Sequence, residues 1–393
     1  MPGATVVRGT VVTPREIIRE GQVVVEDGKI VDVGPWNGGF PGRVLDFRDC
    51  LVASGFIDLH VHGGGGSDVM DASPQGLDRL SDFLAAGGVT SFLATTYSAP
   101  QNDILAVAGT IRNAARKGTE GAIVLGLHLE GPYINPERRG AQSAAHIRSP
   151  SLEELDEVHG AADGVLRIVT MAPELDGALE AAAWLRSKGV IPSAGHTDAT
   201  YDEMMAGVEA GFSHVAHLFN GMRPFHHREP GTVGAALDDD RVTVELIADG
   251  IHLHPAALRL AAGRKGAGKT ALVSDAVAPA GLPDGEHMLG GERVRVEKGR
   301  CLLGSGALAG STIRLSDAVR NMVELAGLPV VEAVEMASTT PAGILGLAER
   351  KGRLAPGMDA DLTVLDKGFS VRLTMVGGRI VYGGGVSRWP ARA

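Results

Sequence analysis

GFIDLHVHGGGG, residues 55–66, is an apolar run of strand length that carries two histidines and ends in four glycines. Side chains at positions i and i+2 of a strand share a face, so His60 and His62 point the same way and can reach one metal ion. The glycines that follow let the backbone pass close to a ligand. The stretch therefore predicts a buried strand that delivers a metal site at its C-terminal end.

Seven similar apolar runs follow, each succeeded by Gly or polar residues and then by a helical pattern. They are TSFLATTY (90–97), AIVLGLHLE (122–130), RIVTMA (167–172), GVIPSAGH (189–196), HVAHLF (214–219), TVELIAD (243–249) and TALVSD (270–275). Near-continuous hydrophobicity is typical of parallel strands covered on both faces. Eight strands alternating with helices, such as 179–189 and the Ser-capped 311–327, predict a (β/α)8 barrel of the TIM type. An open doubly wound sheet is the alternative.

Both ends of the chain have the pattern of short strands. Residues 21–34 form a hairpin pattern around an Asp-Gly turn, and residues 373–384 repeat it around a Gly-Gly turn. Neither end has enough strands for a stable sheet, so we expect the two ends to pair in space. The predicted domains are a small β-sandwich from residues 1–53 and 352–393, and a catalytic barrel from residues 54–351.

The composition excludes several classes of protein. The 393 residues carry a formal net charge of −10, which argues against general affinity for nucleic acid or for membranes. No uninterrupted apolar run reaches the length of about 18 residues that a membrane span needs, and the N-terminus does not resemble a signal peptide. Cys50 and Cys301 are interpreted as core thiols in a reducing compartment, so we expect a cytoplasmic protein.

Ionisable residues gather at the ends of five of the predicted strands. They are His60, His62, Glu130, His196, His217 and Asp275. In a barrel these ends converge on the catalytic face, and a mixed imidazole and carboxylate set suits zinc, iron or manganese. Glu130 could bridge two ions or pair with a nearby arginine. Asp275 could carry the proton of a metal-bound water or act as a weak ligand.

Three other features are set aside. We interpret His128 as packed beneath the site and His214 as lying towards the opposite rim, because it begins its strand. GRKGAGKT (263–270) matches the phosphate-binding loop of nucleotide-binding proteins. That loop needs a strand before it and a helix after it, and the order here is reversed. We therefore expect no nucleotide site.

The motifs as a set resemble one known family. GFIDLHVHGGGG, LGLHLEGP, AGHTDA, HLFNGMRPFHHREPG, ADGIHLHP and VSDAVAPAG, in this order, resemble the N-acetylglucosamine-6-phosphate deacetylases of the amidohydrolase superfamily. The resemblance runs from about residue 20 to about residue 385. It implies a metal-bearing barrel with a small β domain. It also implies hydrolysis of the N-acetyl group of N-acetylglucosamine 6-phosphate, in amino-sugar catabolism and cell-wall recycling.

The resemblance also implies roles for the metal-site residues. Glu130 matches the central ligand, completed by His196 and His217. Asp275 matches the general base and acid that works with metal-bound hydroxide. Some relatives lack the His-x-His pair and use one metal, so the pair here implies capacity for two. The implied cofactor is a divalent metal, zinc first, with iron, manganese or cobalt as alternatives, at one or two ions per subunit.

Substrate contacts follow from the same resemblance. His252 matches a catalytic, substrate-contacting histidine, and Gln142 stands where some members carry a histidine. Arg228 matches a phosphate-binding arginine that relatives supply from the neighbouring subunit, which implies a homodimer. The remaining implied substrate contacts are Asn220, Gly221, His227, Leu308 and Ala309.

Two rival hypotheses remain at this stage. Dihydroorotase- and hydantoinase-type barrels usually bridge two metals with a carboxylated lysine on the fourth strand, and RIVTMAPE (167–174) has no lysine. A non-catalytic barrel would be expected to have lost ligands, whereas all six candidates are present. A small-molecule amino-sugar phosphate is therefore the predicted partner, with no nucleic acid and no membrane.

Overall fold

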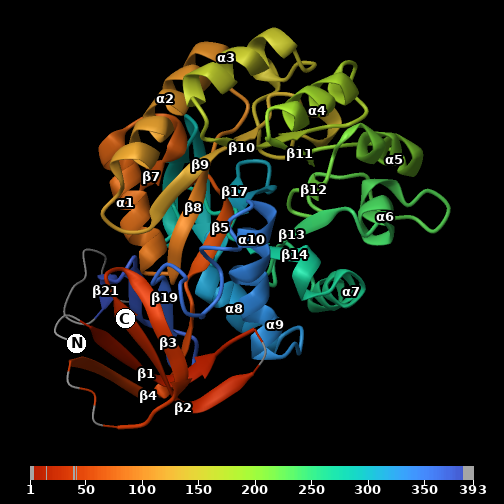
Figure 1. Ribbon diagram of the computed structural model, residues 1–393. Helices are drawn as coiled ribbons and strands as arrows, with labels where there is room; N and C mark the ends of the chain where they lie inside the picture. Colours follow the sequence, from red (N-terminus) through yellow and green to blue (C-terminus); the bar gives the residue numbers. More distant parts are fainter. Residues whose placement is uncertain (1–3, 15, 39, 41, 384–393) are drawn as a thin grey trace.

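Eight parallel strands form the centre of the structure, a computed structural model that describes residues 4–14, 16–38, 40 and 42–383 (Figure 1). In the sheet they neighbour one another in chain order: β5 (Phe56–Val61), β8 (Val89–Thr95), β9 (Ile123–Glu130), β10 (Leu166–Met171), β11 (Ile191–Ala194), β12 (His214–Val215), β13 (Thr243–Ile247) and β14 (Thr270–Val273). A doubly wound sheet would reverse its order at one point. The unbroken order confirms the predicted barrel.

The first and last strands meet at the barrel seam. The Asp275 N–H donates to His60 O at 2.9 Å, and Val61 forms a parallel bridge with Ala276. The buried Asp58 carboxylate accepts from the Ser274 N–H at 3.2 Å, which ties the two strands together. Burial raises the pKa of Asp58 to about 6. The seam places the His-x-His strand directly beside the strand that leads to Asp275.

Helices surround this sheet (Figure 1). They are α1 (Pro74–Ala85), α2 (Gln101–Lys117), α3 (Leu152–Ala162), α4 (Ala178–Ser187), α5 (Tyr201–Ala210), α6 (Gly231–Asp238), α7 (Pro255–Lys265), α8 (Leu315–Glu324), α9 (Val330–Ala337) and α10 (Thr339–Ile344). The predicted Ser cap at the start of 311–327 is wrong, because Ser311 ends a strand and Arg314 precedes the helix.

The phosphate-loop motif at residues 263–270 runs from helix α7 into strand β14. This helix-before-strand order is the reverse of the order that a phosphate-binding loop needs.

The two ends of the chain meet in one seven-stranded sheet, drawn at the lower left of Figure 1. It contains β1 (Thr5–Val12), β2 (Ile17–Glu26), β3 (Lys29–Pro35), β4 (Arg43–Ser54), β19 (Leu362–Leu365), β20 (Val371–Val376) and β21 (Arg379–Gly383). The long strand β4 pairs with β1 from Arg43 to Val52, with a break in register, and with β19 along its last four residues, Leu51–Ser54. The predicted β domain from both termini is therefore present, as one continuous sheet. Residues 1–3 and 384–393 of that prediction lie outside the described residues.

A further sheet is inserted after β14 and was not expected from the sequence. It is antiparallel and consists of β15 (Gly285–Leu289), β16 (Glu292–Glu297), β17 (Arg300–Leu303) and β18 (Leu308–Ser311). The remaining short elements are β6 (Gly63–Gly64), β7 (Ser67–Asp68), η1 (Val69–Asp71), η2 (Pro136–Arg138), η3 (Ala144–His146) and η4 (Ala267–Lys269). The inserted sheet matters for function because it forms one wall of the cleft described below.

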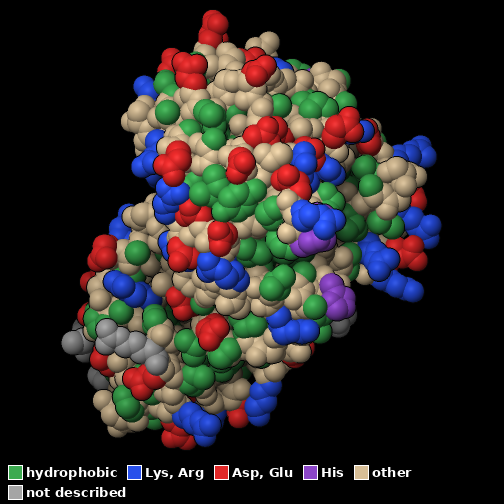
Figure 2. Space-filling view, turned by 90° about the vertical axis from the view of Figure 1, so that its right-hand side faces the viewer, with side chains coloured by type: hydrophobic (Ala, Val, Ile, Leu, Met, Phe, Trp, Pro, Cys, Tyr) green, Lys and Arg blue, Asp and Glu red, His purple; other side chains and the backbone are tan. Residues whose placement is uncertain are grey.

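The surface mixes charges of both signs. Figure 2 shows acidic and basic side chains interspersed on the face nearest α5, α6 and α7, without an extended basic area.

Among the described residues, none of the helices has the length and the apolar character that a bilayer crossing requires. Cys50 and Cys301 are both free thiols.

Candidate metal centre and active-site cleft

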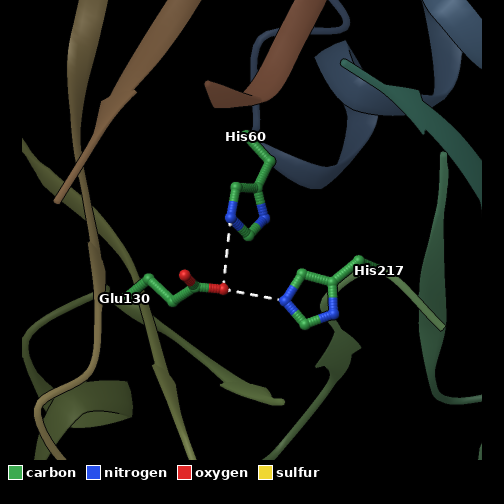
Figure 3. A group of neighbouring side chains, drawn as sticks. All are labelled: His60, Glu130 and His217. Carbon is green, nitrogen blue, oxygen red and sulfur yellow. Dashed lines mark hydrogen bonds and ion pairs between the residues drawn. The ribbon is translucent and has the colours of Figure 1, made fainter. Parts of the chain in front are cut away.

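The carboxylate of Glu130, at the end of β9, lies at the centre of a histidine cluster (Figure 3). Its Oε1 atom is 2.8 Å from His217 Nε2 and 3.2 Å from His60 Nε2. The same oxygen is 3.4 Å from His196 Nε2, and Oε2 is 3.5 Å from His62 Nε2. One buried carboxylate therefore faces the Nε2 atoms of four imidazoles. His60 and His62 lie at the end of β5, whereas His196 follows β11 and His217 follows β12.

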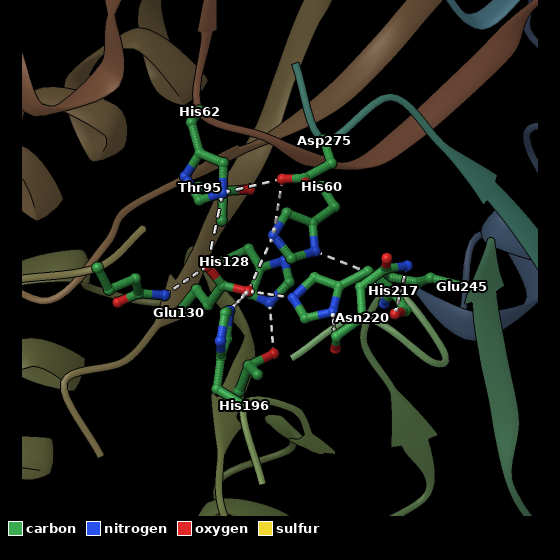
Figure 4. Close-up of polar contacts among 12 residues, drawn as sticks. His60, His62, Thr95, His128, Glu130, His196, His217, Asn220, Glu245 and Asp275 are labelled. Carbon is green, nitrogen blue, oxygen red and sulfur yellow. Dashed lines mark hydrogen bonds and ion pairs between the residues drawn. The ribbon is translucent and has the colours of Figure 1, made fainter. Parts of the chain in front are cut away.

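Asp275 forms the second acidic group of the cluster. Its Oδ1 atom is 3.2 Å from His62 Nε2 and 3.8 Å from His60 Nε2 (Figure 4). Three sets of side chains offer ligand atoms within 4.8 Å of one another: His60 with Glu130 and His217, His60 with His62 and Asp275, and, behind the cluster, His60 with His128 and Glu245. The structure brings together all six residues that the sequence singled out.

Hydrogen bonds on the far side of the rings set the tautomers. Nδ1 of His60 lies 2.9 Å from Glu245 Oε2, and Nδ1 of His196 lies 2.8 Å from the Arg138 carbonyl oxygen. Nδ1 of His217 lies 3.1 Å from a backbone carbonyl oxygen. An imidazole that donates from Nδ1 has a lone pair left on Nε2, and second partners of this kind orient metal-binding histidines.

Three of the cluster residues lie two positions beyond the last residue of their strand. They are His196 after β11, His217 after β12 and Asp275 after β14. Their φ angles are 49°, 29° and 47°, in the left-handed region that non-glycine residues rarely adopt. Such backbone conformations concentrate at functional sites, where the surrounding structure holds them. Each turn redirects its side chain from the strand towards the shared centre.

The charges of the cluster fit a divalent cation. Burial opposes ionisation of Glu130 and Asp275, yet nearby histidines hold the pKa of each carboxyl below its usual range. Burial also disfavours the charged form of His60, but Glu130 and Glu245 raise its pKa well above the usual value. His60 Nε2 is buried and has no hydrogen-bond partner among the described residues. A divalent cation held by these carboxylates and imidazoles would supply positive charge beside the buried carboxylates.

A cleft opens above this cluster. Its volume is about 270 Å³, which suits a small ligand. The predicted site residues that line it are His62, Glu130, Gln142, His196, His217, Asn220, Gly221, His252, Asp275, Leu308 and Ala309. His60 lies beneath the cleft, fully buried. Neither arginine nor lysine is among the described residues that line the cleft.

Gln142 lines the cleft but both ends of its amide contact the protein. Nε2 donates to Glu130 Oε2 at 2.8 Å, and Oε1 accepts from the Ser98 N–H at 2.8 Å and from the Ser98 hydroxyl. The expected hydrogen bond from Gln142 to a substrate would have to replace one of these contacts. Gln142 therefore holds the Glu130 carboxylate in place through its Nε2 hydrogen bond.

Asn220 and Gly221 follow His217 in the same turn. The Asn220 side chain donates to the His217 carbonyl oxygen at 3.2 Å, so it braces the turn from within. Gly221 has a φ of 61°, and a Cβ atom there would lie 2.8 Å from His196 Nδ1. Gly221 is therefore needed for the close approach of the chain to a cluster histidine.

His252 lines the cleft from the loop after β13. Its Nδ1 atom is 2.7 Å from Asp249 Oδ2. Burial alone would lower the pKa of His252, but the hydrogen bond and charge of Asp249 raise it overall. His252 can thus present an N–H donor to the cleft.

His227 and Arg228 are not part of the cleft of their own chain. Both are exposed, and Arg228 borders a separate hollow beside α5 with Thr200 and Tyr201. Within one chain the structure does not bring these two residues to the other predicted site residues.

Three features of the site were missed by sequence reasoning. Glu245, inside β13, contacts both His60 and His214, so His214 is connected to the cluster after all. A charged residue within the apolar run TVELI was the available signal.

Tyr97, two positions past β8, is the second missed residue, and it lines the cleft. The inserted sheet contributes Leu289, Gly290, Glu292 and Leu303 to the wall. His128 is buried as expected, with Nε2 at 2.8 Å from Thr170 Oγ1.

Comparison with known proteins gives a consistent result. Residues 51–381 match the model of the amidohydrolase family. N-acetylglucosamine-6-phosphate deacetylase from Bacillus subtilis is 40% identical over 377 residues, which cover 95% of each chain. N-acetylgalactosamine-6-phosphate deacetylase from Escherichia coli O157:H7 is 42% identical, over 91% of this chain and 94% of the relative.

Solved structures agree with these matches. The N-acetyl-D-glucosamine-6-phosphate deacetylase of Mycobacterium smegmatis, in a mutant form bound to N-acetyl-D-glucosamine-6-phosphate, is 35% identical, with a TM-score of 0.92. The match covers 96% of this chain and 99% of that chain. Fold, cluster and relatives thus lead to one assignment. The chain is a hydrolase that belongs to the amidohydrolase family and, within it, to the N-acetylglucosamine-6-phosphate deacetylase family.

Proposed function

We propose that this enzyme hydrolyses the N-acetyl group of N-acetylglucosamine 6-phosphate, which gives glucosamine 6-phosphate and acetate. The observation that carries the proposal is the Glu130 carboxylate at the centre of four Nε2 atoms, with Asp275 beside it at the floor of a small cleft. Glu130, at the end of the third barrel strand, would bridge the ions that the rival barrels bridge with a carboxylated lysine from their fourth strand. The named activity of close relatives supports the same substrate.

The donor set suits one or two divalent cations, and we propose zinc. Glu130, His196 and His217 would hold one ion, since both imidazoles face Glu130 Oε1, and His60, His62 and Asp275 would hold the second beside Glu130. A bound cation lowers the pKa of water and polarises a carbonyl group. The same residues would also accept iron, manganese or cobalt, and metal analysis of the purified protein identifies the bound ion.

Asp275 is the proton carrier in this proposal. Its lowered pKa keeps it ionised at neutral pH, and its Oδ1 atom faces the cluster. As water adds to the acetamide carbonyl carbon, Asp275 takes the proton. As the C–N bond breaks, Asp275 delivers that proton to the departing nitrogen. The N–H of His252 would donate to a substrate oxygen, while Gln142 holds Glu130 in place.

We further propose that the enzyme is a homodimer in which Arg228 of each chain reaches the cleft of the other. The support is that Arg228 is exposed while the cleft of its own chain has no lysine or arginine among its described lining residues. A bidentate guanidinium contact would hold the 6-phosphate and orient the distant amide. His227 and Asn220 would assist at the same end of the cleft.

Arg228→Ala is expected to lower kcat/KM for the phosphorylated sugar by roughly 10–100-fold, the range for one lost charge-assisted contact. The rate with N-acetylglucosamine that lacks the phosphate should not change, because that substrate has no group for Arg228 to hold. Steady-state kinetics with both substrates gives the comparison. Arg264→Ala, at an exposed arginine on α7, is the control. Equal losses on both substrates would remove Arg228 from the phosphate site.

Mixing variants tests the shared site. A dimer of one Arg228→Ala chain and one Asp275→Asn chain contains one cleft with both residues intact. Random reassembly should therefore restore about a quarter of wild-type activity, because half of the dimers are mixed and each has one complete site. No recovery on mixing would place Arg228 at the site of its own chain or outside it.

A deacetylation assay tests the function directly. The purified chain, stripped of metal and then given zinc, should release acetate from N-acetylglucosamine 6-phosphate with zinc and not without it. Metal analysis should find more than one zinc per chain at saturation. The galactosamine epimer is the second candidate substrate, because one relative of high identity is named for it. A higher kcat/KM for that epimer would reassign the substrate and leave the chemistry unchanged.

A cytoplasmic location remains part of the proposal. The support is chemical: both cysteines are free thiols, as expected in a reducing compartment.

A further inference from the structure

Glu245 is a carboxylate buried behind the histidine cluster. It lies in the middle of β13, between Val244 and Leu246, and all three side chains are inaccessible to solvent. An apolar strand in a barrel normally continues with apolar residues, since an unpaired buried charge costs many kcal/mol. A charged group here needs a set of donors strong enough to offset that cost.

Three groups point at this carboxylate. His60 Nδ1 lies 2.9 Å from Oε2, and the backbone N–H of His217 donates to the same oxygen at 3.1 Å. His214 Nε2 lies 3.0 Å from Oε1. Figure 4 shows Glu245 on the side of His60 and His217 that is opposite Glu130. The residue therefore contacts the cluster from the protein interior and does not face the cleft.

We infer that Glu245 is the positioning residue that fixes His60, and with it the turn of His217, for metal binding. This inference rests on the metal centre of the proposed function. His60 is fully buried and cannot be oriented by anything in the cleft. By accepting a hydrogen bond from Nδ1–H, Glu245 keeps the Nε2 lone pair of His60 on the side that faces Glu130 and Asp275, where an ion would bind.

The requirement for a carboxylate follows from the donor count. A carboxylate only accepts, and its two oxygens can serve all of the three groups that face it. Glutamine has one acceptor oxygen, and its NH2 group would meet a donor at the other position. A leucine of similar size would leave the His60 and His217 N–H groups without a partner in the protein interior.

Glu245 also connects the two predicted ion positions. In the proposed arrangement His217 holds the first ion with Glu130 and His196, which face the same carboxylate oxygen, whereas His60 holds the second with His62 and Asp275. Both histidines contact the same oxygen, Oε2. The His60 contact is made by the imidazole itself, and the His217 contact by its backbone. Loss of Glu245 should therefore weaken the ion held by His60 more than the ion held by His196 and His217.

An outer pair of residues supports the carboxylate. His214 contacts Glu245 on one side, and its Nδ1 atom lies 2.7 Å from the Thr243 hydroxyl. Thr243 in turn donates to the Ser213 carbonyl oxygen at 3.1 Å. The chain of contacts runs from the cluster to the opposite end of β12 and β13, so the carboxylate cannot rotate away from His60 without breaking it.

The test compares zinc binding by the full-length wild-type chain and by Glu245→Gln. Metal-free protein is titrated with zinc against a chelating dye, which gives the stoichiometry and the affinity of each ion. We expect the weaker of the two zinc affinities to fall by roughly 10–100-fold, the usual effect of losing an outer partner of a metal-bound histidine. Excess zinc should restore much of kcat, which a merely structural defect would not show.

Asp361→Asn is the matched control. Asp361 is a buried carboxylate paired with Lys351 near the β domain, away from the cluster. This variant should lose thermal stability and keep both zinc affinities. Unchanged zinc affinities in Glu245→Gln would overturn the inference. Failure of the wild-type chain to bind zinc at all would instead overturn the proposed metal centre.

A second measurement covers the case in which Glu245→Gln does not fold. A crystal structure of the zinc-loaded wild-type protein should show zinc on His60 Nε2, with Nδ1 still within hydrogen-bond distance of Glu245. A ring rotated so that zinc contacts Nδ1 would contradict the positioning role.

Discussion

Asp275→Asn is expected to reduce kcat by roughly 10²–10⁴-fold, towards the upper end because one carboxylate serves as both base and acid. Asparagine has nearly the same shape and can still accept a hydrogen bond from His62, which lies 3.2 Å from Oδ1 in the wild-type chain. It cannot take up a proton at neutral pH. The ion held by Glu130, His196 and His217 should therefore persist while turnover nearly stops, and steady-state kinetics together with metal analysis gives both quantities.

Glu292→Gln is the control for this experiment. Glu292 also lines the cleft, from the inserted sheet, but it belongs to none of the groups of metal-ligating side chains found among the described residues. Loss of its charge should change kcat only slightly. Near-normal kcat in Asp275→Asn would show that another group carries the proton.

Glu130→Gln is expected to abolish metal binding and activity together. The substitution removes the charge that faces four imidazoles and leaves one acceptor oxygen where two are used. The folded-state pKa of Glu130 lies well below its usual value, so its stabilising effect is present at pH 7 and is lost only when the pH falls through that low pKa. The metal-free variant should accordingly lose about 3–5 kcal/mol of unfolding free energy at pH 7.

Thermal melting, metal analysis and kinetics on the same preparations measure this prediction. Glu154→Gln serves as a structural control, because Glu154 pairs with Arg148 and contacts the Tyr133 hydroxyl outside the cluster. It should lower stability without loss of metal. A Glu130→Gln enzyme that keeps two metal ions and wild-type kcat would show that Glu130 is not the central ligand.

The barrel could be predicted from the sequence because its strands are buried on both faces. Runs such as 55–61 and 122–130 are apolar almost throughout, and the structure places strands there. The hairpins at the ends followed from their turns: Asp27 and Gly28 have φ angles of 49° and 76°, as a two-residue hairpin turn requires. Apolar runs and turn residues determine these elements locally, so a single sequence was sufficient to predict them.

The inserted sheet was missed because its strands are short and half exposed. ERVRVE (292–297) alternates polar and apolar residues, and Gly290-Gly291 stands before it, so the signal was present but weak against eight stronger runs. Glu245 was missed for a different reason. Its partners are His60 on β5, His214 at the start of β12 and the backbone N–H of His217 just after β12. A single sequence does not show which strands will place donors around one carboxylate.

The left-handed turns after β11, β12 and β14 restrict how this site could change by mutation. At the positions of His196, His217 and Asp275, the backbone disfavours branched side chains before any question of chemistry arises. Asparagine, aspartate, histidine and glycine tolerate that conformation far better than valine, isoleucine or threonine. The pool of viable replacements is thus already rich in metal-binding groups. A barrel of this design could exchange one ligand for another, and so one metal for another, at a small conformational cost.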